Sequence, residues 1–214
     1  MDEIVIRAMQ KWPNVPNVYG WLKLDRRGAW WIKTRLAQSR TRDDAQPVFE
    51  RISNAAVVEF IGRNYQADDR GRWFFQNGPQ RVFVTLEYTP LVFALRGDGE
   101  SVEAHTGAAP SVVLRAWVDD AGQLLLDTDL GPGIALDRDL ARLLEKIVVT
   151  DGKPADDEAI ESLAAGGAPA LALALGRKRV PLCSIAAADV PKRFRFEPAP
   201  RPASDWGEEP EPPF

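Results

Sequence analysis

Short apolar and aromatic runs alternate with turn residues along most of the chain. The densest example lies within residues 60–87, where 73–75 and 82–86 are two runs with a preference for β-strands, separated by Asn77-Gly78. An Asn-Gly pair tolerates positive φ at both central positions of a turn, so it is a strong signal for a β-hairpin. We therefore predict that these two runs pair with each other.

The hairpin is expected to close through a two-residue loop made of Asn77 and Gly78, which pairs Gln76 with Pro79. Proline has no N–H, so one hydrogen bond of the ladder must be missing there, and the second strand should begin at an edge or a bulge. Apolar side chains fall on both faces of this hairpin. Other parts of the chain must therefore cover both sides.

A helical pattern precedes the hairpin. Asn54 can cap a helix whose apolar positions recur at a spacing of three and four residues, namely Val57, Val58, Phe60 and Ile61. Later in the chain, Asp137 or Asp139 can cap a helix with Leu140, Leu143, Leu144 and Ile147 on one face, and 156–165 is a further predicted helix. Residues 2–11 are expected to form a short helix or strand.

Further strands are predicted wherever such runs flank turn residues. The pairs are 19–24 with 29–33, 91–96 with 101–105, 112–118 with 123–127, and 171–175 with 180–185, with a last strand at 193–196 and a polar loop at 33–46. The simplest arrangement is a meander of seven or eight antiparallel strands with a few packed helices. The predicted class is α+β, mainly antiparallel.

One turn pattern recurs three times. An acidic residue is followed three positions later by glycine and then by bulky residues, at Asp25 to Gly28, Asp68 to Gly71 and Asp119 to Gly122. Asp favours the start of a turn and Gly accepts positive φ. We interpret the pattern as repeated turn chemistry, with duplication as the alternative.

Composition and charge divide the 214 residues unevenly. The whole chain is 45% apolar and 27% charged, which is typical of a soluble globular protein. Residues 1–196 are predicted to form one globular domain, with two subdomains at about 1–95 and 96–196 as an alternative, and 197–214 form an acidic, proline-rich tail. Residues 1–90 carry 14 basic and 10 acidic side chains, 91–196 carry 12 and 16, and the tail carries one and five. Either the halves attract each other or the basic half binds an anion.

The sequence also indicates a location. No run of 18 uncharged apolar residues is present, and the first residues are acidic without an apolar leader, so neither a membrane span nor secretion is expected. The single cysteine, Cys183, fits a reducing compartment. The cytoplasm is the predicted location.

The central stretch carries a family resemblance. The run RNYQADDRGRWFFQNGPQRVFV, with FIG before it and VYGWLKLDRRGAWWIK further upstream, resembles a bacterial family of small cytoplasmic proteins of unknown function. The resemblance covers roughly residues 14–95, and QNGPQR is its most distinctive part. It implies no activity, no cofactor and no catalytic residue.

The residues that could support catalysis lack a recognisable context. The only histidine, His105, has no nucleophile motif beside it, and Cys183 looks like a residue of a core strand. The paired carboxylates, Asp68-Asp69, Asp119-Asp120 and Asp156-Asp157, fall at turns or a helix start, where backbone chemistry explains them. No metal spacing and no phosphate-binding loop is present, so we predict no catalytic residue, no metal and no cofactor.

Polar and basic residues around the hairpin are the best candidates for binding. The predicted set is Arg63, Asn64, Arg72, Gln76, Asn77, Gln80 and Arg81, while Trp73 and Phe75 are expected in the core. Three hypotheses follow: a binding module that presents this hairpin tip to a protein or a small anionic ligand, a protein that binds RNA or single-stranded DNA, and an enzyme with an unrecognised site. The first is the favoured interpretation.

Overall fold

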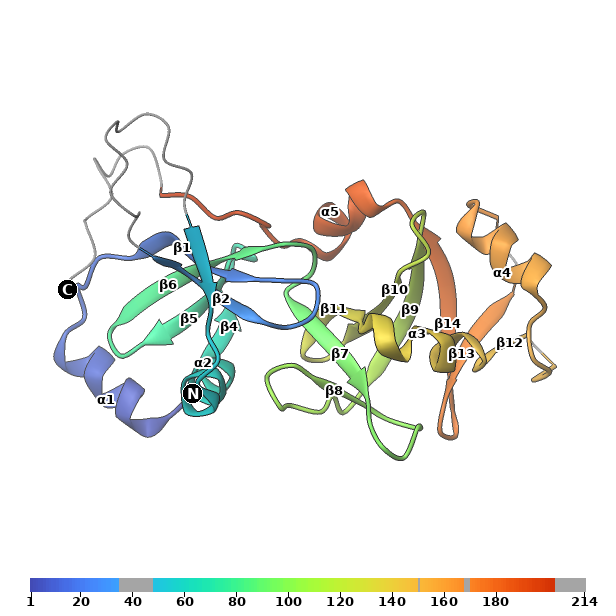
Figure 1. The fold of residues 1–214 in the computed structure, drawn as a ribbon, viewed down its shortest axis with the longest axis horizontal. Coiled ribbons are helices and arrows are strands. Elements are labelled where there is room, and N and C mark those ends of the chain that lie inside the picture. The colour runs from blue at the N-terminus through green and yellow to red at the C-terminus, as the bar shows by residue number, and fades with distance from the viewer. Residues whose placement is uncertain (35–47, 150, 168–169, 203–214) are drawn as a thin grey trace. The chain divides into compact units, whose positions relative to one another are not determined.

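The chain forms two compact units. The computed structural model describes residues 1–34, 48–149, 151–167 and 170–202 (Figure 1). Unit 1 comprises Met1–Glu87 together with the segment from Phe196 onwards, and unit 2 comprises Tyr88–Arg195. The sequence placed a possible boundary near residue 95, and the structure places it between residues 87 and 88. The predicted loop at 33–46 lies almost wholly outside the described residues.

Unit 1 is built on one six-stranded mixed sheet. Its elements are α1 (Glu3–Lys11), β1 (Val18–Leu24), β2 (Trp30–Thr34), β3 (Val48–Arg51), α2 (Ala55–Arg63), β4 (Tyr65–Ala67), β5 (Trp73–Asn77) and β6 (Gln80–Leu86). The strand order is β3-β2-β1-β6-β5-β4, and the central pair, β1 and β6, is parallel. The other neighbours pair antiparallel.

Unit 2 is built on an eight-stranded mixed sheet. Its elements are β7 (Leu91–Leu95), β8 (Val102–Ala104), β9 (Val113–Asp119), β10 (Leu124–Thr128), β11 (Gly131–Ala135), α3 (Asp137–Leu144), β12 (Ile147–Val149), α4 (Asp157–Ala164), β13 (Leu171–Leu175), β14 (Lys178–Ile185), η1 (Ala187–Asp189) and α5 (Val190–Phe194). The strand order is β12-β13-β14-β9-β10-β11-β7-β8. Here β9 and β14 are parallel, as are β7 and β11.

The two sheets repeat one topology. When β9 to β14 are matched in chain order to β1 to β6, the strand orders become identical, and both sheets have a parallel pair at the same place. The hairpin β7–β8 is an addition at the β11 edge. The α+β class is confirmed, with mostly antiparallel pairing. The strands are divided between two sheets with parallel pairs, which a single meander does not contain.

The recurring acidic turns have one geometry. In each, Oδ1 of the aspartate accepts two backbone N–H groups at 2.8–3.0 Å, and the glycine, at φ of 74–78°, donates its N–H to the aspartate carbonyl. The turns at Asp25 and Asp119 join the matched hairpins β1–β2 and β9–β10, whereas the Asp68 turn joins β4 to β5. Turn chemistry is thus confirmed, and two of the three turns also hold equivalent places in the repeat.

The core of unit 1 lies between the sheet and α2. Leu22, Leu24, Val84 and Leu86 share one face of the central strands and are almost fully buried. Helix α2 begins after Asn54, whose Oδ1 accepts the N–H of Val57 at 3.2 Å as predicted. Its Phe60 packs edge-to-face against Phe75, with the ring centres 5.5 Å apart, and Trp30 packs likewise against Tyr65.

The central hairpin forms, but with a different loop. Asn77 pairs with Gln80 and Gln76 with Arg81, so Gly78 and Pro79 are the two central residues. The predicted pairing of Gln76 with Pro79 was therefore wrong. Gly78 supplies the positive φ of 57°, and Pro79 lies within the turn, where no ladder hydrogen bond is required from it. Because the register changes by two positions, the same residues still share each face.

The predicted last strand at 193–196 was also wrong. Residues 190–194 form α5 instead, with Pro191 in its first turn, where the missing proline N–H costs no helical hydrogen bond. Ile147, predicted on a helix, begins β12 instead. Across the described ranges, no helix is long and apolar enough to cross a lipid bilayer.

Candidate functional site

The second face of the unit 1 sheet, opposite α2, carries basic and aromatic side chains together. The alternation along β1, β2, β5 and β6 and the ring contacts place nine such residues there: Tyr19, Trp21, Lys23, Trp31, Lys33, Arg72, Phe74, Arg81 and Phe83. We call this surface the cation–aromatic face. It extends over four neighbouring strands, in the order β2-β1-β6-β5.

Two arginines lie over two phenylalanine rings at the centre of this face. The guanidinium carbon of Arg81 is 4.6 Å from the centre of the Phe74 ring, and that of Arg72 is 4.6 Å from the centre of the Phe83 ring. The two phenylalanines are cross-strand partners, and each is only 1% exposed. Cation–π attraction therefore holds one guanidinium group over each ring of a buried aromatic pair.

Aromatic rings extend the face towards β1 and β2. The ring of Tyr19 is stacked on that of Phe83, with centres 4.6 Å apart and planes inclined by 6°. The ammonium of Lys33 lies 5.2 Å from the centre of the Trp21 ring. The ring of Trp31 is held in place by a hydrogen bond, which its Nε1 donates to Oδ2 of Asp25 at 2.8 Å. Tyr19, Trp21 and Trp31 are only partly buried, so they offer flat apolar surface to a ligand.

Arg72 is held by the neighbouring turn. Its Nη2 lies 2.7 Å from Oδ2 of Asp68, and its Nε donates to the same oxygen at 2.8 Å. Burial raises the pKa of the Asp68 carboxyl, but hydrogen bonds from Arg72 and Arg70 outweigh that effect, so the pKa lies below its usual value. Burial likewise lowers the pKa of Arg72, and Asp68 more than restores it. The Asp68 turn thus positions Arg72 on the face.

Replacing Asp68 by Asn tests whether the ion pair between Asp68 and Arg72 makes the stability of unit 1 depend on pH. The variant keeps the Oδ1 acceptor and loses the charge, so we expect it to lower the free energy of unfolding of unit 1 by about 2 kcal/mol at pH 7. Because the folded pKa of Asp68 is depressed, its contribution is present above the unfolded pKa of about 3.9 and is lost as the pH falls through the folded value. Urea titrations at pH 7 and pH 3 measure this difference.

The matched control is the exposed neighbour, Asp69→Asn, which should change the stability little at either pH. A difference between wild type and Asp68→Asn that is as large at pH 3 as at pH 7 would contradict the proposed role of the charge.

Arg81 differs from Arg72 in its partners. Among the described residues no carboxylate lies within ion-pair distance of its guanidinium, which is half-buried over Phe74. Its cross-strand neighbour is Gln76. Arg81 therefore provides positive charge on the face that no described acid neutralises.

Two of the predicted binding residues are buried. Asn64 and Gln76 are each 1% exposed. Asn64 accepts the N–H of Asp2 at 2.7 Å through Oδ1 and donates to the carbonyl of Phe60, which ties α1 to α2. Gln76 donates through Nε2 to the carbonyl of Gly78 at 2.9 Å, so its buried side chain stabilises the turn between β5 and β6. Both side chains have a structural role here.

The other predicted residues are spread over two sides of the hairpin. Arg63 pairs with Asp2, at 3.2 Å from Nε to Oδ1, on the α2 side. Gln80 alternates with Arg81, so it lies on the side of α2, and it donates to the carbonyl of Pro16 at 3.1 Å. Asn77 is exposed at the turn. Of the predicted set, only Arg72 and Arg81 meet on the cation–aromatic face with their side chains outside the core.

The aromatic partners on β1 and β2 were not anticipated. The sequence contained a signal for them, since Trp21 and Lys23 alternate with Leu22 and Leu24. What it did not reveal was that β1 pairs in parallel with β6. That pairing brings residues about 60 positions apart in the chain onto one surface.

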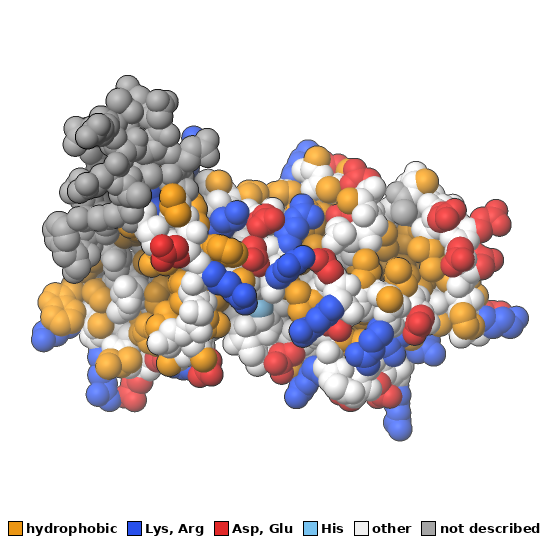
Figure 2. All heavy atoms as spheres, in the orientation of Figure 1, with side chains coloured by type: hydrophobic (Ala, Val, Ile, Leu, Met, Phe, Trp, Pro, Cys, Tyr) orange, Lys and Arg blue, Asp and Glu red, His pale blue; other side chains and the backbone are white. Residues whose placement is uncertain are grey.

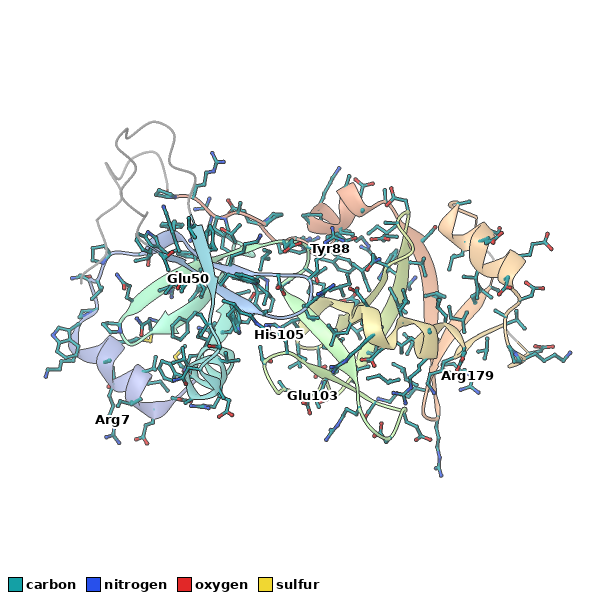
Figure 3. The ribbon with its side chains drawn as sticks, in the orientation of Figure 1. Arg7, Glu50, Tyr88, Glu103, His105 and Arg179 are labelled. Carbon is teal, nitrogen blue, oxygen red and sulfur yellow. The ribbon has the colours of Figure 1, made fainter. Side chains whose placement is uncertain are left out.

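His105, Cys183 and Asp156, which the sequence raised as candidates for catalysis, all lie in unit 2. His105 accepts the N–H of Val92 at 3.3 Å through Nδ1, and it lies just beyond β8 (Figure 3). The sulfur of Cys183 lies 3.2 Å from Nη1 of Arg115. Acidic side chains gather over α4 (Figure 2), where Asp156 caps the helix through the N–H of Ala159. Within the described part of the chain, no group of three or more His, Cys, Asp or Glu could hold a metal ion.

A family model matches almost the whole chain. Residues 1–201 match the family described as "Protein of unknown function (DUF2946)". The chain belongs to this family. No curated protein matches its sequence.

Two solved structures are similar to the chain. One is a DUF1285 family protein from Silicibacter pomeroyi DSS-3, with 15% identity, a TM-score of 0.49, and coverage of 86% of this chain and 97% of that one. The other is a DUF1285 family protein from Shewanella baltica OS155, with 16% identity, a TM-score of 0.36, and coverage of 55% and 85%. Both structures belong to the DUF1285 family, which is a different family from that of this chain. No function is known for this chain's family.

Proposed function

We propose that unit 1 is a binding module that takes up an acidic polypeptide segment of a protein partner on its cation–aromatic face. The observation that carries the proposal is the pair of arginines over Phe74 and Phe83, with Arg81 lacking any acidic partner among the described residues. A guanidinium that is already ordered on a ring loses little conformational freedom when it binds a carboxylate.

The layout of the face favours an extended ligand over a small anion. A small anion is usually bound by donors that converge on one point. Here Lys33 lies on β2 and Arg81 on β6, with β1 between them. Neighbouring strands are about 4.8 Å apart, so the four strands span about 14 Å. A polypeptide that crosses them can place one carboxylate near each cation and apolar side chains against Trp21 and Trp31.

Single-stranded nucleic acid is the second candidate, because the partly exposed rings of Tyr19, Trp21 and Trp31 resemble platforms on which bases stack. The two central rings argue against it. Phe74 and Phe83 are 1% exposed and covered by guanidinium groups, so no base can stack on them. The net charge of −4 on the whole chain also disfavours a polyanion of high charge density.

Three probes separate these candidates on the full-length protein. They are a 12-residue peptide rich in Asp and Glu with one Trp, a Lys-rich peptide of the same length, and a 12-nucleotide oligothymidine, each titrated at low and high salt. We expect the acidic peptide to bind, more weakly at high salt because the contacts are partly exposed, and the Lys-rich peptide not to bind. Preferential binding of oligothymidine would support the second candidate instead.

Replacing Arg81 by Ala should weaken binding of the acidic peptide about tenfold, the size expected for loss of one well-placed arginine contact. The fold should survive, because Phe74 keeps its other neighbours. The control is Arg7→Ala, since Arg7 lies on α1, pairs with Glu3 and points away from the sheet (Figure 3). Equal affinities for the two variants would contradict the assignment of the face.

The single cysteine supports the cytoplasm as the compartment for this function.

A further inference from the structure

The last described residues bring the chain to the edge of the cation–aromatic face. Phe196 is buried, and the N–H of Glu197 donates to the carbonyl of Gly71 at 3.0 Å. The N–H of Leu86 donates to the carbonyl of Pro198 at 2.7 Å. Gly71 directly precedes Arg72, so the chain passes one residue away from one of the two central arginines. It then continues with residues 203–214.

The charge of this last segment is opposite to that of unit 1. Residues 203–214 contain four acidic side chains, Asp205, Glu208, Glu209 and Glu211, and no basic one. Residues 1–87 contain 14 basic and 10 acidic side chains. The excess of positive charge in residues 1–87 therefore equals the negative charge of residues 203–214. Among the described residues, no carboxylate lies within ion-pair distance of Arg81.

The composition of the segment also suits this surface. It contains Trp206 among the acids, and an indole can pack on partly exposed rings such as Trp21 and Trp31. Three prolines, at positions 210, 212 and 213, favour an extended backbone, which suits a ligand that crosses strands. Twelve residues can span up to about 40 Å when extended, which exceeds the width of the face.

We propose that residues 203–214 of the chain occupy the cation–aromatic face when no partner is bound, and that a partner's acidic segment must displace them. This inference rests on the proposed function of the face. A segment tethered this closely has an effective concentration of about 1 mM. With an intrinsic dissociation constant of about 100 μM, it lowers the apparent affinity for a competing peptide about tenfold.

The test compares two full-length proteins. In one, the acids of the segment are neutralised by Asp205→Asn, Glu208→Gln, Glu209→Gln and Glu211→Gln. In the control, three exposed acids of α4 are neutralised by Asp157→Asn, Glu158→Gln and Glu161→Gln, which changes the net charge in the same direction within unit 2. Both are titrated with the same 12-residue acidic peptide that tests the face, alongside wild type.

We expect the first variant to bind the peptide about tenfold more tightly than wild type, and the α4 control to bind like wild type. In addition, the side-chain Nε–H resonances of Arg72 and Arg81 should shift between wild type and the first variant without any peptide. Equal affinities and unchanged resonances would overturn the inference and leave the proposed function standing. Failure of all three proteins to bind the peptide would overturn the proposed function, and this inference with it.

Discussion

Replacing Asp119 by Ala is expected to lower the free energy of unfolding of unit 2 by about 3 kcal/mol, because it leaves several hydrogen-bond donors without an acceptor. Asp119 is 1% exposed. Its Oδ2 accepts the hydroxyl of Tyr88 at 2.5 Å, and its Oδ1 accepts the N–H groups of Ala121 and Gln123. Hydrogen exchange measured by mass spectrometry reports unit 2 separately from unit 1 and is the appropriate measurement.

The equivalent turn of unit 1 provides the matched control. Asp25 holds the same backbone groups, but it is only partly buried, and its second oxygen accepts Trp31 Nε1 at 2.8 Å. Water can replace more of these bonds, so Asp25→Ala should cost unit 1 about 1 kcal/mol. Losses of equal size in the two units would show that burial of the carboxylate does not set the effect. Tyr88→Phe measures the hydroxyl contribution alone.

Replacing Gly133 by Ala is the second large effect. Gly133 lies on β11, where an added Cβ would stand 2.5 Å from Cε2 of Phe93 and 2.8 Å from the carbonyl oxygen of Leu91. Phe93 is fully buried and the backbone of Leu91 belongs to the paired strand β7, so neither can move aside easily. Overpacking of this kind should destabilise unit 2 by about 3 kcal/mol.

A glycine in open space is the control for this substitution. Gly97 lies in the turn after β7, is exposed, and has no atom within 4 Å of its added Cβ. Gly97→Ala should therefore change the thermal midpoint by less than about 2 °C, which corresponds to a few tenths of a kcal/mol. If Gly133→Ala melted at the wild-type temperature, the close packing of β11 against Phe93 would be refuted.

Local chemistry made much of this fold predictable. The Asp-to-Gly turns, the Asn54 cap and the hairpins all depend on residues within a few positions of each other. Pro79 shows the limit of that information, because the choice between two adjacent loops depends on which residue can lack a ladder hydrogen bond. Parallel pairing of β1 with β6 is not encoded locally, since it joins strands separated in the chain by a helix and four other strands.

The candidate site was predictable in part for the same reason. Arg72 and Arg81 stood out because two arginines flank an aromatic run. Asn64 and Gln76 have the same polar character in the sequence, but their amides satisfy backbone groups of α1, α2 and the turn. Which polar side chain serves the fold and which faces a ligand depends on contacts between distant segments, such as the contact of Asp2 with Arg63 and Asn64.

The central claim is that the cation–aromatic face binds an acidic segment. The most direct measurement is an NMR titration of the full-length protein, with the acids of residues 203–214 neutralised, against the 12-residue acidic peptide. The account predicts shifts at the side-chain Nε–H groups of Arg72 and Arg81 and at the amides of β1 and β6, with Arg63 on the opposite side unchanged. Shifts confined to α1, α2 or unit 2 would contradict it.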